Sequence, residues 1–145
     1  MNRPGRSVAL WTNLVGMDEA TFRAMLVRHL NHADTDPDTS HDMYHDDAVL
    51  EFPQSGERFE GVKNFREWRS IYPAAVTYEI HEVRGRHDLW IVELSVSYDG
   101  GPPSFGVSIH ELRGGKIARE TIYVAEGWEA PEWRAKWRAS PEQPA

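Results

Sequence analysis

The sequence predicts an α+β fold in which a strongly curved mixed or antiparallel sheet is wrapped by three N-terminal helices into a cone with an internal pocket. Two features of the chain support this expectation. Apolar residues recur at helical spacing in the N-terminal half, and from residue 76 onward they alternate with polar residues at the period of a strand. Since a meander of strands buries one face, the helices are expected to cover that face and to leave an open end for a ligand.

Three segments of the N-terminal half carry a helical pattern. They span residues 17–32, 38–44 and 62–72. Asp18 is the expected N-cap of the first helix, Asp38 or Thr39 can cap the second, and Pro73 ends the third.

The remaining regular segments read as strands. The expected strands cover residues 48–52, 58–60, 76–84, 89–98, 105–113 and 116–125. The last four are joined by short turns, of which DGGPP (99–103) and Gly114-Gly115 contain strong breakers. They therefore form a meander.

The chain is expected to hold one domain, because no internal linker or repeat divides its 145 residues. Residues 1–16 are interpreted as a poorly ordered arm or an extra strand, and 17–127 as the cone domain. Residues 128–145 are expected to form a short helix with Trp133 and Trp137 on one face, followed by a disordered tail.

The composition excludes several classes of partner. A formal charge of −7 argues against binding to nucleic acid or to an anionic membrane surface. The absence of cysteine excludes disulfides and thiolate metal sites and fits a cytoplasmic protein. The apolar run at residues 8–11 is too short for a signal peptide or a membrane span. A small hydrophobic molecule is the expected partner.

The tryptophan content suggests a second partner. The chain has six tryptophans, which is many for its length, and large rings are enriched in the cores of interfaces. The outer face of the predicted meander is also apolar. We therefore expect a homodimer, with contacts from Trp90, Trp128, Trp133 and Trp137.

The C-terminal hairpin, GVSIHELRGGKIARETIYV (106–124), carries the main candidate for catalysis. His110 can take and return a proton near neutral pH. A two-residue turn at Gly114-Gly115 pairs His110 with Arg119, whereas a bulged turn pairs it with Glu120. Both registers remain open, so the predicted catalytic residues are His110, Glu120 and Arg119.

A metal site is not expected. His41 and His45 have the i, i+4 spacing of a helical metal pair, but the segment HDMYH lacks the glutamate of H-E-x-x-H and a marked third ligand. The Gly-Gly pairs do not follow the pattern of phosphate-binding loops. We predict a protein without cofactor, and we interpret Tyr44 as the residue that this segment buries.

A broader resemblance rests on YHDDAVLEFP, on the G-E-R-F-E-G that follows it before a helix, and on the ending G-G-K-I-A-R-E-T-I-Y. These segments resemble the nuclear-transport-factor-2-like superfamily and its SnoaL-like branch of polyketide cyclases and pocket proteins. The resemblance covers about residues 17–127 and implies the cone fold. The superfamily includes ketosteroid isomerase, limonene-type epoxide hydrolase and many non-enzymes, so it does not select one activity.

The resemblance allows a comparison with ketosteroid isomerase, residue by residue. The place of its general-base aspartate is taken by Phe52, that of its oxyanion-hole aspartate by His110, and that of its oxyanion tyrosine by Leu26. Two of the three groups are hydrocarbon, so steroid isomerisation by that mechanism is not expected.

Two other activities of the superfamily can be compared with the candidate residues. The epoxide hydrolases hold a water between two aspartates and an arginine, for which Glu120 and Arg119 are the nearest substitutes, and a second acid is not evident. A cyclase of this type needs a single base, which His110 can supply.

These observations lead to two alternative functions. One is a cofactor-free acid/base enzyme of the cyclase, isomerase or hydrolase type that acts on a small hydrophobic or polyketide-like substrate. The other is a dimeric protein of the same fold that binds a ligand or is purely structural. In either case, the expected pocket wall comprises Phe52, Trp68, Tyr72, Leu26 and Tyr44.

Overall fold

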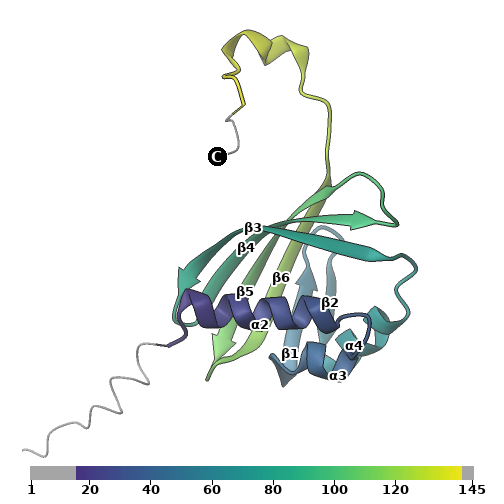
Figure 1. The fold of residues 1–145 in the computed structure, drawn as a ribbon, viewed down its shortest axis with the longest axis vertical. Helices are drawn as coiled ribbons and strands as arrows, with labels where there is room; N and C mark the ends of the chain where they lie inside the picture. The colour runs from purple at the N-terminus through teal and green to yellow at the C-terminus, as the bar shows by residue number, and fades with distance from the viewer. Residues whose placement is uncertain (1–15, 142–145) are drawn as a thin grey trace, which may run out of the picture.

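The computed structural model describes residues 16–141, in which the helices lie on one side of a single sheet (Figure 1). The elements in chain order are α2 (Glu19–His32), α3 (Pro37–His41), β1 (Tyr44–Phe52), β2 (Glu57–Glu60), α4 (Val62–Ser70), β3 (Val76–Arg86), β4 (Leu89–Tyr98), β5 (Ser104–Arg113), β6 (Lys116–Glu126) and the 3₁₀ helix η1 (Glu132–Trp137).

The sheet has six strands in the order β2-β1-β6-β5-β4-β3. The β1–β6 pair is parallel and the other pairs are antiparallel, which confirms the predicted mixed sheet. The helix α2 runs across the concave face of the sheet, and α3 and α4 close one side (Figure 1). From residue 16 onward, two helices, α2 and α3, precede the sheet, because α4 lies between β2 and β3, so the expectation of three N-terminal helices was slightly off.

The helix boundaries differ from expectation at α3. The Asp36 side chain, rather than Asp38 or Thr39, caps this helix by accepting a hydrogen bond from the Thr39 amide at 3.1 Å. Pro37 therefore occupies the first turn, where its missing N–H costs nothing. The helix ends at His41, and Tyr44 already belongs to β1. At α2, Asp18 is the N-cap, as predicted.

The narrow end of the cone is filled by hydrocarbon. Phe22 of α2 stacks on Trp90 of β4 with ring centroids 5.1 Å apart, and both rings are buried. Trp90 therefore belongs to the core, and the expectation that it contributes to an interface was wrong. Leu26 and Phe65 continue this core toward the other helices.

The C-terminal segment differs from the predicted α-helix. It is a 3₁₀ helix, in which three residues complete a turn, so Trp133 and Trp137 lie on different faces rather than on one. The predicted arm over residues 1–16 and the tail lie almost entirely outside the described residues. Within the described range, no helix is long and apolar enough to cross a membrane.

Gly85 provides a test of the strand packing at the narrow end. A Cβ at this position would lie 2.1 Å from the Leu89 carbonyl oxygen and 2.8 Å from the Trp90 Cα. We expect Gly85→Ala to lower the free energy of unfolding by about 3 kcal/mol or more, because backbone rather than a flexible side chain must move. Urea unfolding measures this change.

Gly114→Ala is the matched control. Gly114 also has a positive φ, of 59°, but nothing lies within 4 Å of a Cβ built there. This substitution is expected to cost about 1 kcal/mol through backbone strain alone. Equal costs for the two variants would contradict the close approach at Gly85.

Candidate functional site

The hairpin of β5 and β6 brings His110 and Glu120 together inside the cone. A bulge between Glu111 and Leu112 shifts the register, so His110 lies opposite Glu120. Both side chains are buried, and His110 Nδ1 lies 3.5 Å from Glu120 Oε1. Of the two partners that the sequence allowed, the structure has Glu120. The expected bulged turn was wrong, because Arg113 pairs with Lys116 across a two-residue turn and the extra residue lies further along β6.

Arg119 lies on the opposite, outer face of the sheet. Its guanidinium contacts Glu51 at 2.8 Å and Glu111 at 3.6 Å, and 47% of its side chain is exposed. The structure therefore separates Arg119 from His110 and Glu120.

Glu120 is the centre of a buried polar cluster. Its Oε2 accepts a hydrogen bond from the Tyr44 hydroxyl at 2.7 Å, and its Oε1 accepts one from the Ser108 hydroxyl at 3.0 Å. The Arg69 guanidinium lies 3.6 Å from Oε2. The carboxylate therefore has a cation and two hydroxyl donors around it in the interior of the fold.

Arg69 connects this cluster to solvent. It stands near the end of α4, and 21% of its side chain is exposed. Its Nη1 donates to the Tyr44 hydroxyl oxygen and to His41 Nε2, each at 3.2 Å. The guanidinium carbon also lies 5.4 Å from the Trp68 ring centroid, within the range of a cation–π contact. Arg69 is thus more exposed to solvent than Glu120 or His110.

Two further histidines support the cluster from the helices. His41 Nδ1 donates to the Pro37 carbonyl, which leaves Nε2 free to accept from Arg69. His29 Nδ1 donates to the Ser40 carbonyl at 2.6 Å, and its ring lies edge-on to those of His41 and Tyr44. Both imidazoles are consistent with the neutral form.

The environment determines which groups carry charge. Burial would raise the pKa of Glu120, but His110, Arg69 and the Tyr44 hydroxyl outweigh it and lower this pKa to about 2. Burial lowers the pKa of His110, against the attraction of Glu120. Burial also raises the pKa of Tyr44 above its usual value. At neutral pH the cluster therefore holds one anion, one cation and neutral rings.

His110 lies beside the Glu120 carboxylate in the interior of the fold, away from the exposed part of the cluster. Its ring packs edge-on against Phe22, with centroids 5.2 Å apart, and only 1% of the residue is exposed. The Ser108 hydroxyl donates to Glu120, so Ser108 accepts from His110 Nε2–H at 3.0 Å. The remaining nitrogen, Nδ1, has no hydrogen-bond partner and faces Glu120.

Aromatic side chains gather beside Arg69, near the ends of α4 and β1. Trp68 packs against Phe52 and Phe59, with centroids 6.0 and 5.4 Å away, and its Nε1–H is buried without an acceptor. Tyr72 is 43% exposed and lies 6.1 Å from Tyr98. Of the predicted wall residues, Phe52, Trp68 and Tyr72 lie at this rim, whereas Tyr44 belongs to the polar cluster and Leu26 to the core.

Sequence reasoning missed Arg69, Ser108, His29 and His41 as members of the site. Arg69 follows Trp68 on a helix in which the sequence pattern marks only the apolar residues, and an arginine in that place is usually solvated. His41 was considered with His45 as a metal pair, but His45 bonds to the Arg113 carbonyl instead. Among the described residues, no three His, Cys, Asp or Glu side chains converge as a metal site.

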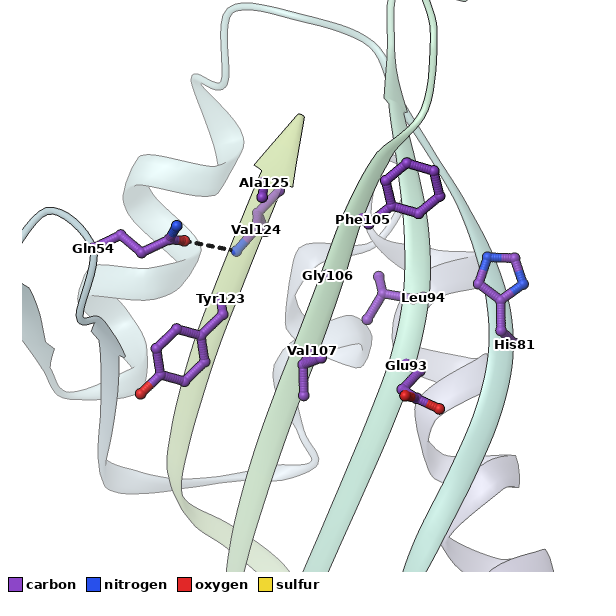
Figure 2. A pocket seen from close by; sticks show the side chains of 10 residues that line it. All are labelled: Gln54, His81, Glu93, Leu94, Phe105, Gly106, Val107, Tyr123, Val124 and Ala125. Atoms are coloured by element: carbon purple, nitrogen blue, oxygen red, sulfur yellow. Dashed lines mark hydrogen bonds between the residues drawn. The ribbon is translucent and has the colours of Figure 1, made fainter. Parts of the chain in front are cut away.

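The described surface also has a shallow groove outside the cone. It lies on the outer face of the sheet, bordered by His81, Glu93, Phe105 and Tyr123, and the helices lie behind the sheet in this view (Figure 2).

Comparison with known proteins defines the family. The profile of the SnoaL-like domain matches residues 19–120. The chain belongs to the SnoaL-like family. An NTF2-like protein of unknown function from Burkholderia xenovorans is 41% identical to this SnoaL-like chain, with 88% of this chain and 100% of that one covered and a TM-score of 0.76.

More distant structures share the fold. A proposed ketosteroid isomerase from Kribbella flavida is 18% identical, with 86% of this chain and 92% of that one covered and a TM-score of 0.74. An LEH-like epoxide hydrolase from M. tuberculosis is also 18% identical, with 72% and 83% covered and a TM-score of 0.62. No curated protein gave a match. These similarities establish the nuclear-transport-factor-2-like cone.

The buried histidines predict how stability depends on pH. Burial, with Arg69 next in effect, lowers the pKa of His29 from 6.5 to about 3. The unfolded chain then binds the proton more readily than the folded one. The contribution of His29 to the free energy of unfolding is therefore fully present above pH 6.5 and is lost as the pH falls toward 3. Between pH 7 and pH 5, we expect His29 alone to cost about 2 kcal/mol. Urea unfolding across this range tests the prediction.

His29→Gln should flatten this pH dependence, because the variant keeps a donor for Ser40 but cannot be protonated. His32→Gln is the control, since it removes an imidazole from the same helix outside the cluster. An unchanged pH dependence in His29→Gln would contradict the assignment of a neutral, buried His29.

Proposed function

We propose that this SnoaL-like protein is a cofactor-free enzyme that moves a proton on a small, largely apolar carbonyl compound bound at the open end of the cone. The observation that supports this proposal most strongly is the pair of Glu120 and Arg69, 3.6 Å apart, with the Tyr44 hydroxyl bonded to both. Buried charges of this kind are concentrated at functional sites.

The fold does not require such a pair. Removing a carboxylate and a guanidinium from water costs several kcal/mol for each ion, and hydrocarbon of similar volume often stabilises a core better. The hydrocarbon at the narrow end of the same cone, around Phe22 and Trp90, illustrates that alternative. Retention of the charges next to an aromatic rim therefore favours a chemical role.

Each group has a role that its surroundings support. Glu120, ionised at neutral pH, accepts a proton from the carbon next to the carbonyl, and the electron pair of that C–H bond moves onto the carbonyl oxygen. The Arg69 guanidinium stabilises the resulting enolate oxygen. In an isomerisation, Glu120 then returns the proton to another carbon of the conjugated enolate. In a cyclisation, the enolate carbon attacks a second carbonyl, whose π electrons move onto its oxygen, and that oxygen takes the proton from Glu120.

The remaining polar residues position Glu120. Tyr44 and Ser108 hold one carboxylate oxygen each. His110 supports Glu120 from the interior of the fold, because its Nδ1, which has no hydrogen-bond partner, can accept a hydrogen bond from Glu120 once that carboxyl is protonated. Trp68, Phe52 and Tyr72 form the apolar wall that selects a hydrophobic substrate.

One observation favours a second candidate, a ligand-binding protein without turnover. Both oxygens of Glu120 already accept hydrogen bonds, and its low pKa makes it a weak base. In that case Arg69 and the aromatic rim would bind an anionic or carbonyl-containing ligand, and Glu120 would only hold Arg69 in place.

Substitution of Glu120 separates the two candidates. We expect Glu120→Gln to reduce the exchange of α-protons for deuterium in 2-acetylcyclohexanone by about 10²- to 10⁴-fold, the usual contribution of a general base. Proton NMR in D₂O follows the exchange, and the same sample gives the binding of the ketone from line broadening.

Glu111→Gln on the outer face of the same hairpin is the matched control and should exchange like the wild type. Binding of the ketone with no exchange above the buffer rate in any variant would support the binding protein and contradict the enzyme.

The pH dependence distinguishes Glu120 from His110 as the base. Because the pKa of Glu120 is about 2, its ionised form persists throughout the range in which the protein is folded. We therefore expect the exchange rate, corrected for buffer catalysis, to stay constant from about pH 8 down to the lowest pH at which the protein remains folded. Because burial lowers the pKa of His110, a rate that falls tenfold through an inflection below about 6.5, and an inflection that His110→Gln abolishes, would instead identify His110 as the base.

A further inference from the structure

Tyr78 is a half-exposed phenol on the face of the sheet that the helices cover. Its partner across the β3–β4 pair is Val96, which is only 4% exposed. Alternate residues of a strand share a face, so Val96 points the same way as Val92 and Trp90, both of which belong to the core. Tyr78 therefore stands on the face that carries the buried cluster, although 45% of the residue is exposed.

The short connection between α4 and β3 fixes Tyr78 relative to Arg69. Residues 71–75 form this connection, and its last residue, Ala75, is tied to the end of β4. The Ala75 N–H donates to Asp99 Oδ1 at 2.9 Å, and the Ala75 carbonyl accepts from the Asp99 N–H at 2.8 Å. The start of β3 is therefore held close to the end of the helix that carries Arg69.

The Tyr78 hydroxyl is a donor that the protein does not use. Among residues 16–141 it has no hydrogen-bond partner. Burial raises the pKa of Tyr78 above its usual value, the Arg69 charge opposes this rise and the Glu120 charge adds to it. The phenol thus lies within electrostatic reach of both charges and keeps its proton at neutral pH, so it can donate to a ligand bound beside them.

The low pKa of Glu120 limits the C–H bonds that this carboxylate can break. A carboxylate with a pKa of about 2 is a weak base. A hydrogen on a carbon between two carbonyls is much more acidic than one beside a single carbonyl, because the charge left behind spreads over two oxygens. Two separate donors near Glu120 stabilise such a charge better than one donor does.

We propose that Tyr78 is a further substrate-binding residue, which donates a hydrogen bond to a second oxygen of the substrate while Arg69 binds the first, and that the substrate is a 1,3-dicarbonyl compound. This substrate class rests on the function proposed above. Glu120 takes the proton from the carbon between the carbonyls, and the electron pair of the broken C–H bond spreads over both oxygens. A compound with one oxygen leaves the Tyr78 hydroxyl without an acceptor, so Tyr78 selects against it.

The binding of two matched ketones tests the role of Tyr78. 2-Acetylcyclohexanone has two oxygens, whereas acetylcyclohexane has the same ring and acetyl group with only one. We expect the wild type to bind the diketone about tenfold more tightly than the monoketone. Tyr78→Phe should reduce this preference to about twofold by weakening the diketone alone, the effect expected from the loss of one hydrogen bond. Titrations followed by proton NMR of the ligands give both dissociation constants.

Tyr123→Phe is the matched control. Tyr123 is 42% exposed, and its ring stands on the opposite face of the same sheet, away from the helices (Figure 2). This variant should bind both ketones like the wild type. An equal loss of both ketones in Tyr78→Phe, an unchanged preference in that variant, or a wild type without a preference would overturn the proposal. Urea unfolding of Tyr78→Phe should match the wild type, because the ring stays in place.

These measurements separate the role of Tyr78 from the proposed enzyme, since they follow binding rather than turnover. A wild type that prefers the diketone but exchanges no α-protons above the buffer rate would contradict the enzyme and still support Tyr78 as a donor. Exchange that depends on Glu120, with no preference for the diketone, would support the enzyme and overturn the assignment of Tyr78.

Discussion

The ion pair of Glu120 and Arg69 is the constraint on which the rest of the site depends. A carboxylate buried among Tyr44, Ser108 and His110 is stable only when a cation lies beside it, and Arg69 is that cation. Arg69 in turn requires acceptors in the interior, which Tyr44 and His41 supply. The five elements that carry these groups, α3, α4, β1, β5 and β6, are therefore held in one arrangement by electrostatics as well as by packing.

The cone has an apolar end that is packed with hydrocarbon, and a polar centre that lies next to an aromatic rim. At the apolar end, Gly85 allows β3 to approach the backbone of β4 closely, and Trp90 stacks on Phe22. The hydrocarbon there fixes α2 against the sheet without directional bonds. Further along, the low polarity that this packing creates strengthens every interaction around Glu120. A ligand bound under the rim would experience the same low polarity.

The sequence predicted the cone with a curved mixed or antiparallel sheet, and it placed His110 and Glu120 on the two strands of one hairpin. It did not decide between Arg119 and Glu120 as the partner of His110, since the bulge between Glu111 and Leu112 lies within the strands and not in the turn. It also missed Arg69, because an arginine beside Trp68 on a short helix is normally solvated, and only the tertiary fold directs it to Glu120. Trp90 was expected at an interface because nothing in the local pattern reveals its stacking on Phe22.

The ionisation of Glu120 is the most direct test of this electrostatic arrangement. Carbon-13 NMR of the labelled side-chain carboxyl, followed against pH in the wild type and in Arg69→Met, measures its pKa. In the wild type the resonance should show the ionised form down to the lowest pH at which the protein remains folded, and in Arg69→Met the pKa should rise, because Arg69 lowers it. A wild-type carboxyl that titrates at or above 4.5, with no change in the variant, would contradict the ion pair as the centre of the site.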